Sequence, residues 1–276
     1  MKEIEKLKET ILKEYPRLDL DSKFQFKCHP GVPCFNNCCA DINIFLTPYD
    51  IIRLKHKLGI SSGEFLAKYT IMPFDENLPY PVVLLKMQDN EKKSCHFVGD
   101  KGCTVYNDRP WACRMYPLGL ASPSEGHPDV EKEFYFLLKE SVCRGFEENN
   151  EYNVSEWLND QGIADYNEMG ELFKNLTLHK FFNEKNKLEP QKIEMFFMAC
   201  YHLDKFREFL FGSSFFNKFD IDEETQKKLK EDDLELLKLG YKWLHFALFG
   251  EKTLKIKEDV LTTKQQELKN RTEQKK

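Results

Sequence analysis

The sequence predicts an α+β protein with a cysteine-rich N-terminal half that contains short antiparallel strands, and with a helical C-terminal half. Eight of the nine cysteines fall between residues 28 and 143. Short β-rich runs lie among these cysteines, whereas apolar residues beyond residue 150 recur at helical spacing. With 41% hydrophobic residues in a chain of 276, there is enough apolar material for a full core.

The first predicted elements are helices. Residues 1–15 have an amphipathic pattern that ends before a proline, and we assign residues 1–23 to an N-terminal helical segment. A threonine cap followed by Pro48 starts a helix that ends at Gly59, and Ser61 caps a shorter helix through residue 69. These two helices form an insert between two groups of cysteines.

The predicted strands follow the insert. β-rich runs cover residues 82–87, 95–97 and 103–106, and the turn Gly99–Gly102 joins the last two. A further β-rich segment around residues 134–138 leads into Cys143. Residues 24–146 are therefore predicted to form a cysteine-cluster domain.

Residues 147–250 are predicted to be helical, and residues 251–276 to form a charged tail. Cys200 lies on one of the apolar stripes, so we expect it to be a small buried side chain and not a ligand. The three stripes are Tyr166, Met169, Phe173 and Leu176; Phe196, Cys200, Leu203, Phe206 and Leu210; and Leu234, Leu237, Tyr241, Leu244 and Leu248.

The clustered thiols predict a metal centre. Disulfides are disfavoured because the cysteine number is odd and the N-terminus has no apolar secretory core. Eight thiols make two tetrahedral sets of four, or one set with spare thiols. The adjacent Cys38 and Cys39 project in different directions, which favours two centres or an extended cluster. The cofactor is expected to be an iron–sulfur cluster or zinc, and the candidate ligands are Cys28, Cys34, Cys38, Cys39, Cys95, Cys103, Cys113 and Cys143.

Charged neighbours of these cysteines are candidates for a supporting role. Four thiolates around a divalent ion leave negative charge, which Arg109 and Arg114, on either side of Cys113, are expected to offset beside the cofactor. His29 and His96 each follow a candidate ligand directly. A histidine can replace a thiolate in a zinc site, but we favour the interpretation of both as partly exposed loop residues.

Composition and motifs disfavour other classes. A formal net charge of −5 offers no general attraction to nucleic acid or to an anionic membrane, and no apolar run is long enough to span a bilayer. The two insert helices resemble a helix-turn-helix, but the second offers a single base, Lys68. Asp41 stands where a radical S-adenosylmethionine motif needs its third cysteine. We expect a cytoplasmic protein with a protein partner or protein substrate, and with no nucleic-acid or membrane partner.

The cysteines stand in a series of spaced motifs: Cys28, Cys34, Cys38 and Cys39; Cys95-His96-Phe97; Gly102-Cys103-Thr104-Val105-Tyr106; Arg109-Pro110-x-x-Cys113-Arg114-x-Tyr116-Pro117; and Cys143. The order of these motifs resembles the YkgJ-type cysteine-cluster family, with its CxxCxxCC-like signature, over roughly residues 24–146. The resemblance implies a zinc- or iron-chelating domain. The same signature is similar to that of bacterial flagellin lysine N-methylases, which implies a metal-dependent protein-modifying or redox enzyme as one option. The alternative is a zinc-stabilised protein-interaction module without catalysis.

Overall fold

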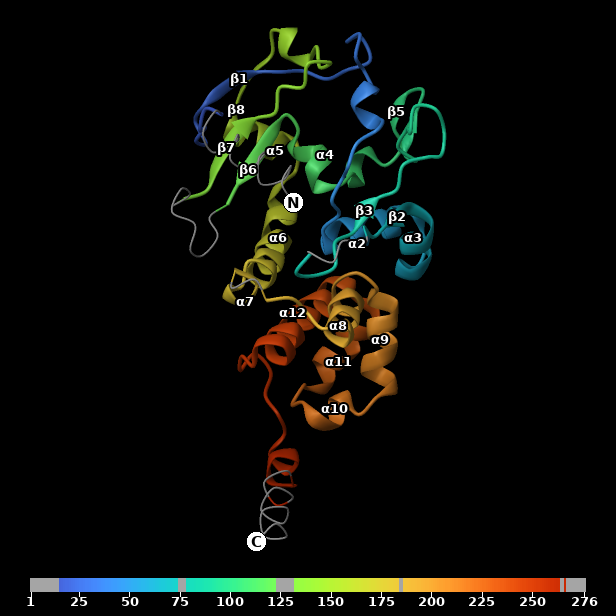
Figure 1. Ribbon diagram of the computed structural model, residues 1–276, viewed down its shortest axis with the longest axis vertical. Coiled ribbons are helices and arrows are strands. Elements are labelled where there is room, and N and C mark those ends of the chain that lie inside the picture. The colour runs from blue at the N-terminus through green and yellow to red at the C-terminus, as the bar shows by residue number, and fades with distance from the viewer. Residues whose placement is uncertain (1–14, 74–77, 123–131, 184–185, 264–265, 267–276) are drawn as a thin grey trace. The chain divides into compact units, whose positions relative to one another are not determined.

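A computed structural model describes residues 15–73, 78–122, 132–183, 186–263 and 266 (Figure 1). The chain divides into two compact units, Met1–Leu188 and Glu189–Lys276. All the named strands among these described residues are short, antiparallel and part of the first unit, and helices make up most of the second, so the predicted α+β class is confirmed. Most of the helix predicted over residues 1–15 lies outside the described residues, and the domain boundaries drawn from the sequence stay predictions.

Two strands that flank the cysteine-rich segment pair with each other in the first unit. β1 (Lys23–Gln25) pairs with β8 (Glu151–Asn153), and Phe24 is registered against Tyr152. α5 (Val154–Asp160) begins directly after β8, with Asn153 and Glu156 forming a capping box. This pairing brings the segments that carry Cys28 and Cys143 into one neighbourhood.

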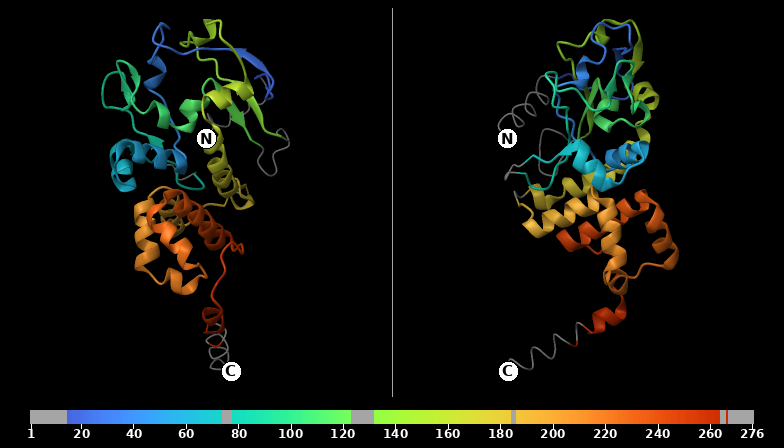
Figure 2. Two further views of the ribbon diagram at one scale, coloured as in Figure 1. Left: turned by 180° about the vertical axis from the view of Figure 1, so that it is seen from behind. Right: turned by 90° about the vertical axis from the view of Figure 1, so that its right-hand side faces the viewer.

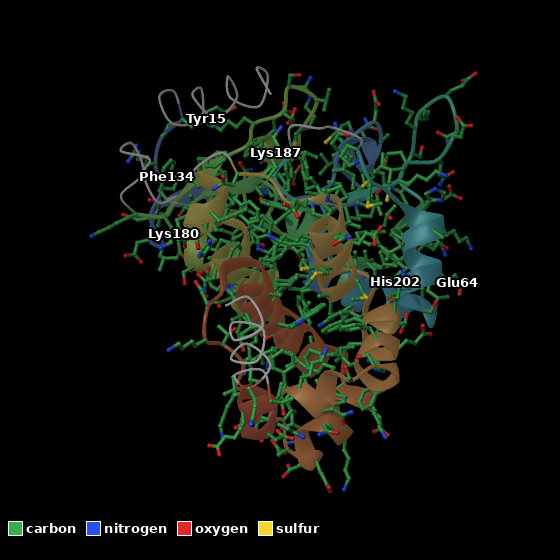
Figure 3. All side chains as sticks on the ribbon, turned by 60° about the horizontal axis from the view of Figure 1, so that its bottom comes forward. Tyr15, Glu64, Phe134, Lys180, Lys187 and His202 are labelled. Atoms are coloured by element: carbon green, nitrogen blue, oxygen red, sulfur yellow. The ribbon has the colours of Figure 1, made fainter. Side chains whose placement is uncertain are left out.

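A compact apolar core lies beneath these strands. α4 (Trp111–Met115) leads into β6 (Leu118–Ala121), which pairs with β7 (Phe134–Leu137). Tyr15 packs with Phe134 and Phe136 on the far side of this hairpin (Figure 3). The core residues of the unit are Phe24, Phe26, Met115, Leu118, Val154, Trp157 and Ile163.

The insert helices have the predicted limits. α2 (Pro48–Leu58) has a capping box at Thr47 and Asp50 and ends at Gly59, whose φ of 65° is the left-handed conformation that glycine favours. α3 (Ser62–Tyr69) starts where the Ser61 hydroxyl accepts from the Glu64 amide. It buries Phe65 and Leu66.

The strands of this region are shorter than the sequence suggests. β2 (Thr70–Ile71) pairs with β3 (Leu84–Leu85), so only two residues of the run 82–87 are in a strand. The hairpin of β4 (Val98–Gly99) and β5 (Gly102–Cys103) turns through two residues, with Gly102 at φ 111°. The predicted hairpin is present, but its first strand lies at 98–99 and not at 95–97, and of residues 103–106 only Cys103 is in a strand. Residues Tyr106–Asp108 form a short 3₁₀ helix, η2.

Helices connect and build the rest of the chain. α6 (Ala164–Thr177) and α7 (Lys180–Asn183) complete the first unit. Within the second unit, α8, α9 and α12 contact one another, α10 contacts α9, and α11 contacts α12 (Figure 2). The stripe predicted from Phe196 to Leu210 is divided between α8 and α9, because Tyr201 and His202 leave the helical path and His202 caps α9. The bounds are α8 (Pro190–Cys200), α9 (Leu203–Gly212), α10 (Phe215–Lys218), α11 (Glu223–Glu231) and α12 (Asp233–Phe249).

Gly240 allows the close approach of α12 and α8. A Cβ at this position would lie 2.7 Å from the Ala199 carbonyl oxygen, a backbone atom that cannot rotate away. We expect Gly240→Ala to lower the free energy of unfolding of the second unit, because overpacking of about 1–3 kcal/mol exceeds the helix-propensity gain of up to about 1 kcal/mol. The matched control is Gly170→Ala in α6, where no atom lies within 4 Å. Gly170→Ala should raise the free energy of unfolding measured in urea. An equal rise in Gly240→Ala would contradict the account of Gly240.

Candidate metal centre

The first cysteine segment is a series of tight turns. Backbone bonds run from Val32 to His29, from Phe35 to Val32, and from Asn37 to Cys34, each over three residues. Buried Val32 anchors this loop. Asn36 adopts a left-handed φ of 68°. The turns end in η1 (Asn37–Cys39), a single 3₁₀ turn.

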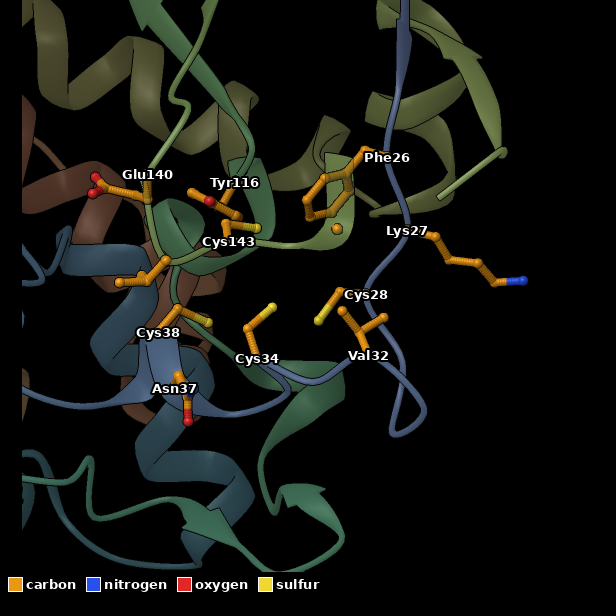
Figure 4. Close-up of a pocket in the computed structure, with 12 residues that line it drawn as sticks. Phe26, Lys27, Cys28, Val32, Cys34, Asn37, Cys38, Tyr116, Glu140 and Cys143 are labelled. Atoms are coloured by element: carbon orange, nitrogen blue, oxygen red, sulfur yellow. The ribbon is translucent and has the colours of Figure 1, made fainter. Parts of the chain in front are cut away.

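Four thiols from this segment and from residue 143 face one cavity. Cys28, Cys34, Cys38 and Cys143, which we call the first thiol group, line a cavity of about 40 Å³. Figure 4 shows their four sulfurs turned toward the same space. The Arg144 amide donates to the Cys34 sulfur at 3.1 Å, which fixes the loop of Cys143 against the first segment.

The remaining four clustered cysteines are neighbours of one another. We call Cys39, Cys95, Cys103 and Cys113 the second thiol group. The Cys95 amide donates to the Cys39 carbonyl at 2.7 Å, and the β4–β5 hairpin carries Cys103 back alongside the segment that follows Cys95. The thiol of Cys113, on α4, interacts electrostatically with those of Cys95 and Cys103.

Burial disfavours the thiolate form of several of these cysteines. Burial raises the pKa of Cys28 to about 11 and that of Cys113 to about 12, and it also raises the pKa of Cys95 and Cys103. The hydrogen bond between the adjacent thiols raises the pKa of Cys39 and lowers that of Cys38 to about 7. A metal ion must therefore displace protons from most of these groups.

Arg109 lies within electrostatic range of both thiol groups. Its side chain is 8% exposed, and its Nη1 donates to the Tyr106 carbonyl at 2.6 Å. Its charge opposes the rise that burial causes in the pKa of Cys28, Cys103 and Cys113. This position suits the charge-offsetting role expected from the sequence, which stays a prediction.

Arg114 is equally buried, but its guanidinium is turned to backbone carbonyls. Nε donates to the Arg109 carbonyl at 3.2 Å, Nη1 to that of Gln161 at 2.5 Å, and Nη2 to that of Asn107. The group also lies over the Tyr166 ring, 4.7 Å from its centroid. These contacts tie α4 to its surroundings, and the cofactor-binding role expected for Arg114 stays a prediction.

The two histidines differ: His29 is hydrogen-bonded through both ring nitrogens, whereas the Nε2 atom of His96 is buried and has no hydrogen-bond partner among the described residues. His29 Nε2 pairs with Glu148 at 3.1 Å, and its Nδ1 accepts from the Gly31 amide. The His96 ring packs edge-on against Tyr69.

Asp50 links α2 to the start of α4, the helix that carries Cys113, in a way that the sequence does not reveal. Its buried carboxylate accepts from the Thr47 amide at 2.7 Å and from the Trp111 amide at 2.7 Å. Burial raises its pKa to about 6. The capping box of α2 is the only sequence signal for Asp50, and it gives no hint of the bond that links α2 to the start of α4.

The thiol donors suit a soft metal ion, but they are not arranged to coordinate one as they stand. In the part of the chain described, no group of three or more His, Cys, Asp or Glu side chains is arranged to hold a metal ion as it stands. Neutral thiols gain little from mutual approach, whereas thiolates converge when a cation bridges them. The residues therefore fit a thiolate-bound metal in kind and number, and binding requires them to draw together. All nine cysteines are free thiols, and none of the described helices is long and apolar enough to cross a membrane.

Comparison with known proteins points to the same segment. Residues 27–144 match the family model CxxCxxCC, described as "Putative zinc- or iron-chelating domain". This stretch holds all eight cysteines of the two thiol groups and excludes Cys200. Searches of curated proteins and of solved structures gave no match. The resemblance drawn from the order of the cysteines is thus confirmed over residues 27–144, the stretch that matches this family model.

Proposed function

We propose that the cysteine-cluster domain binds zinc or iron through the thiolates of Cys28, Cys34, Cys38 and Cys143. The observation that carries this proposal is the convergence of the four sulfurs on one cavity (Figure 4). Thiolate ligands select zinc or iron–sulfur centres over hard cations such as magnesium or calcium. Four such donors fill the tetrahedral coordination that both of these centres use.

The size of the cavity supports an ion over an organic ligand. At about 40 Å³, it is far smaller than the roughly 300–1,000 Å³ of sites for small organic molecules. Its walls include the apolar side chains of Phe26, Val32 and Val142. A thiolate–metal centre enclosed by such walls is shielded from water on those sides, which strengthens its electrostatic interactions.

The position of the ligands supports a role in holding the domain together. Cys28, Cys34 and Cys38 come from the start of the domain and Cys143 from its end. The backbone links between these ends are few: the short β1–β8 pair, and the bonds from the Phe26 and Lys27 amides to the carbonyls of Asn150 and Gly145. A metal ion bound by all four thiolates would cross-link the two ends. We therefore propose a metal-stabilised domain as its basic function, on which redox chemistry, protein modification or protein interaction would depend.

Metal analysis of anaerobically purified protein tests the proposal. We expect zinc or iron in the wild type, a loss of metal from the first thiol group in Cys34→Ala, and wild-type content in Cys200→Ala. Cys200 is fully buried in α8, so its substitution is a matched control for the loss of a cysteine. A visible absorption spectrum separates the two metals, because iron–sulfur clusters absorb there and zinc thiolates do not. Wild-type protein without bound metal, or equal loss in both variants, would contradict the proposal.

A further inference from the structure

The backbone separates the adjacent cysteines of the first segment. Cys38 and Cys39 lie in the 3₁₀ turn η1, in which consecutive side chains leave the axis about 120° apart. Cys38 lines the cavity of the first thiol group, and Cys39 is not among its lining residues. The two thiols still touch through a hydrogen bond, so the two groups adjoin at this pair.

The second thiol group has its own supporting contacts. The Cys39 carbonyl holds the Cys95 amide, and the Phe97 amide donates to the Cys95 sulfur at 3.4 Å. The Asn36 side chain donates to the Gly99 carbonyl at 3.2 Å, which fixes the β4–β5 hairpin against the first segment. These contacts hold the segments that carry Cys39, Cys95 and Cys103 beside one another, next to the first thiol group.

The two groups also differ in exposure. Cys28 and Cys38 of the first group are exposed, whereas every member of the second group is partly buried. A metal bound at the first group is therefore more accessible to a chelator in solution than one bound at the second.

We propose that the eight thiols form two adjoining metal centres, a more accessible one at the first thiol group, whose metal exchanges faster, and a less accessible one at the second. This inference rests on the proposed metal binding and adds the number of centres, the ligands of each and their different accessibility. It assigns Cys39 to a different centre from its neighbour Cys38.

Cadmium-113 NMR of the full-length chain, reconstituted with cadmium, tests the proposal. We expect two equivalents of bound cadmium and two resonances. Cys34→Ser should remove one resonance, Cys103→Ser should remove the other, and Cys200→Ala should leave both. A competing chelator should strip the wild type in two phases of equal amplitude, and the fast phase should be absent from Cys34→Ser.

The outcomes separate this inference from the proposed function. One bound equivalent with one resonance would show a single centre and overturn the inference while leaving metal binding intact. Loss of both resonances in a Cys34→Ser protein whose circular dichroism matches the wild type would show that the centres are not independent, which also overturns it. No bound cadmium, zinc or iron in the wild type would overturn the proposed function itself. If Cys103→Ser does not fold, the resonance count and release phases of the wild type still decide the number of centres.

Discussion

Complete removal of metal is expected to unfold the first unit and to leave the second unit folded. The named strands of the cysteine-cluster domain are two to four residues long, and the cysteine loops are built from single turns. Structural thiolate zinc contributes about 10–16 kcal/mol in small domains, which equals or exceeds the whole stability of about 5–15 kcal/mol of a typical domain. The second unit is helical, and its one cysteine is a buried core residue. It therefore contains none of the proposed metal ligands.

Hydrogen exchange followed by mass spectrometry measures this effect for each unit separately. Peptides that contain β1, α4 and β8 should lose protection after dialysis against a chelator, and peptides from α8 and α12 should keep it. Readdition of metal should restore the protection. Unchanged protection throughout the first unit in protein shown to be free of metal would rule out a structural centre.

The same protein should lose metal as the pH falls. The pKa of Cys28 is about 11 and that of Cys113 about 12 in the ion-free protein, so a metal must displace their protons. For each such thiol, binding weakens by about tenfold for every pH unit below its pKa. The stability supplied by the metal is therefore present at neutral and higher pH and is lost on acidification. A metal content that does not change between pH 8 and pH 5, measured after dialysis, would contradict this expectation.

Substitution of Arg114 by methionine is expected to lower the free energy of unfolding by about 3–5 kcal/mol. The change removes three hydrogen bonds that a charged guanidinium donates to the carbonyls of Arg109, Gln161 and Asn107. Hydrogen bonds of charged groups contribute about 1.5–3 kcal/mol each. The expected loss lies at the low end of their sum, because the Arg109 carbonyl keeps the Tyr166 hydroxyl as a donor and the Asn107 carbonyl keeps Arg53. The substitution also removes the contact of the guanidinium with Tyr166. Urea unfolding of the metal-loaded protein measures the loss.

Two further variants separate the loss of the Arg114 hydrogen bonds from the loss of its charge. Arg144→Met removes an arginine whose side chain is 54% exposed and which pairs with Glu147 on the surface, so its effect should stay within about 1 kcal/mol. Arg114→Lys keeps the charge but cannot reach three carbonyls at once. If Arg114 positions α4, the lysine variant will be nearly as unstable as the methionine variant. Full rescue of both stability and metal retention by lysine would instead show that charge alone matters.

The local parts of this fold could be predicted from the sequence. The limits of α2 follow from the Thr47 cap and from Gly59, which are signals within the helix itself. The divergence of Cys38 and Cys39 follows from their adjacency in the chain. The buried state of Cys200 follows from the apolar stripe of α8.

The non-local parts could not be predicted. The β1–β8 pair joins residues more than a hundred positions apart, and neither strand has a pattern long enough to specify a partner. The assignment of Cys143 to the first thiol group depends on the Arg144 amide reaching Cys34. The partners of Arg114 are backbone carbonyls, which every residue carries, so no side-chain motif identifies them.

The β1–β8 pair has a consequence for the order in which a newly made chain can acquire metal. All four members of the second thiol group have been synthesised once Cys113 has left the ribosome, whereas the first group lacks Cys143 until thirty residues later. The strand that brings Cys143 beside Cys28 comes later still, at residues 151–153. During translation the second thiol group is therefore complete first. The exposed thiols of Cys28 and Cys38 lack their fourth partner for longer, and in that interval they can react with other metal ions or with oxidants.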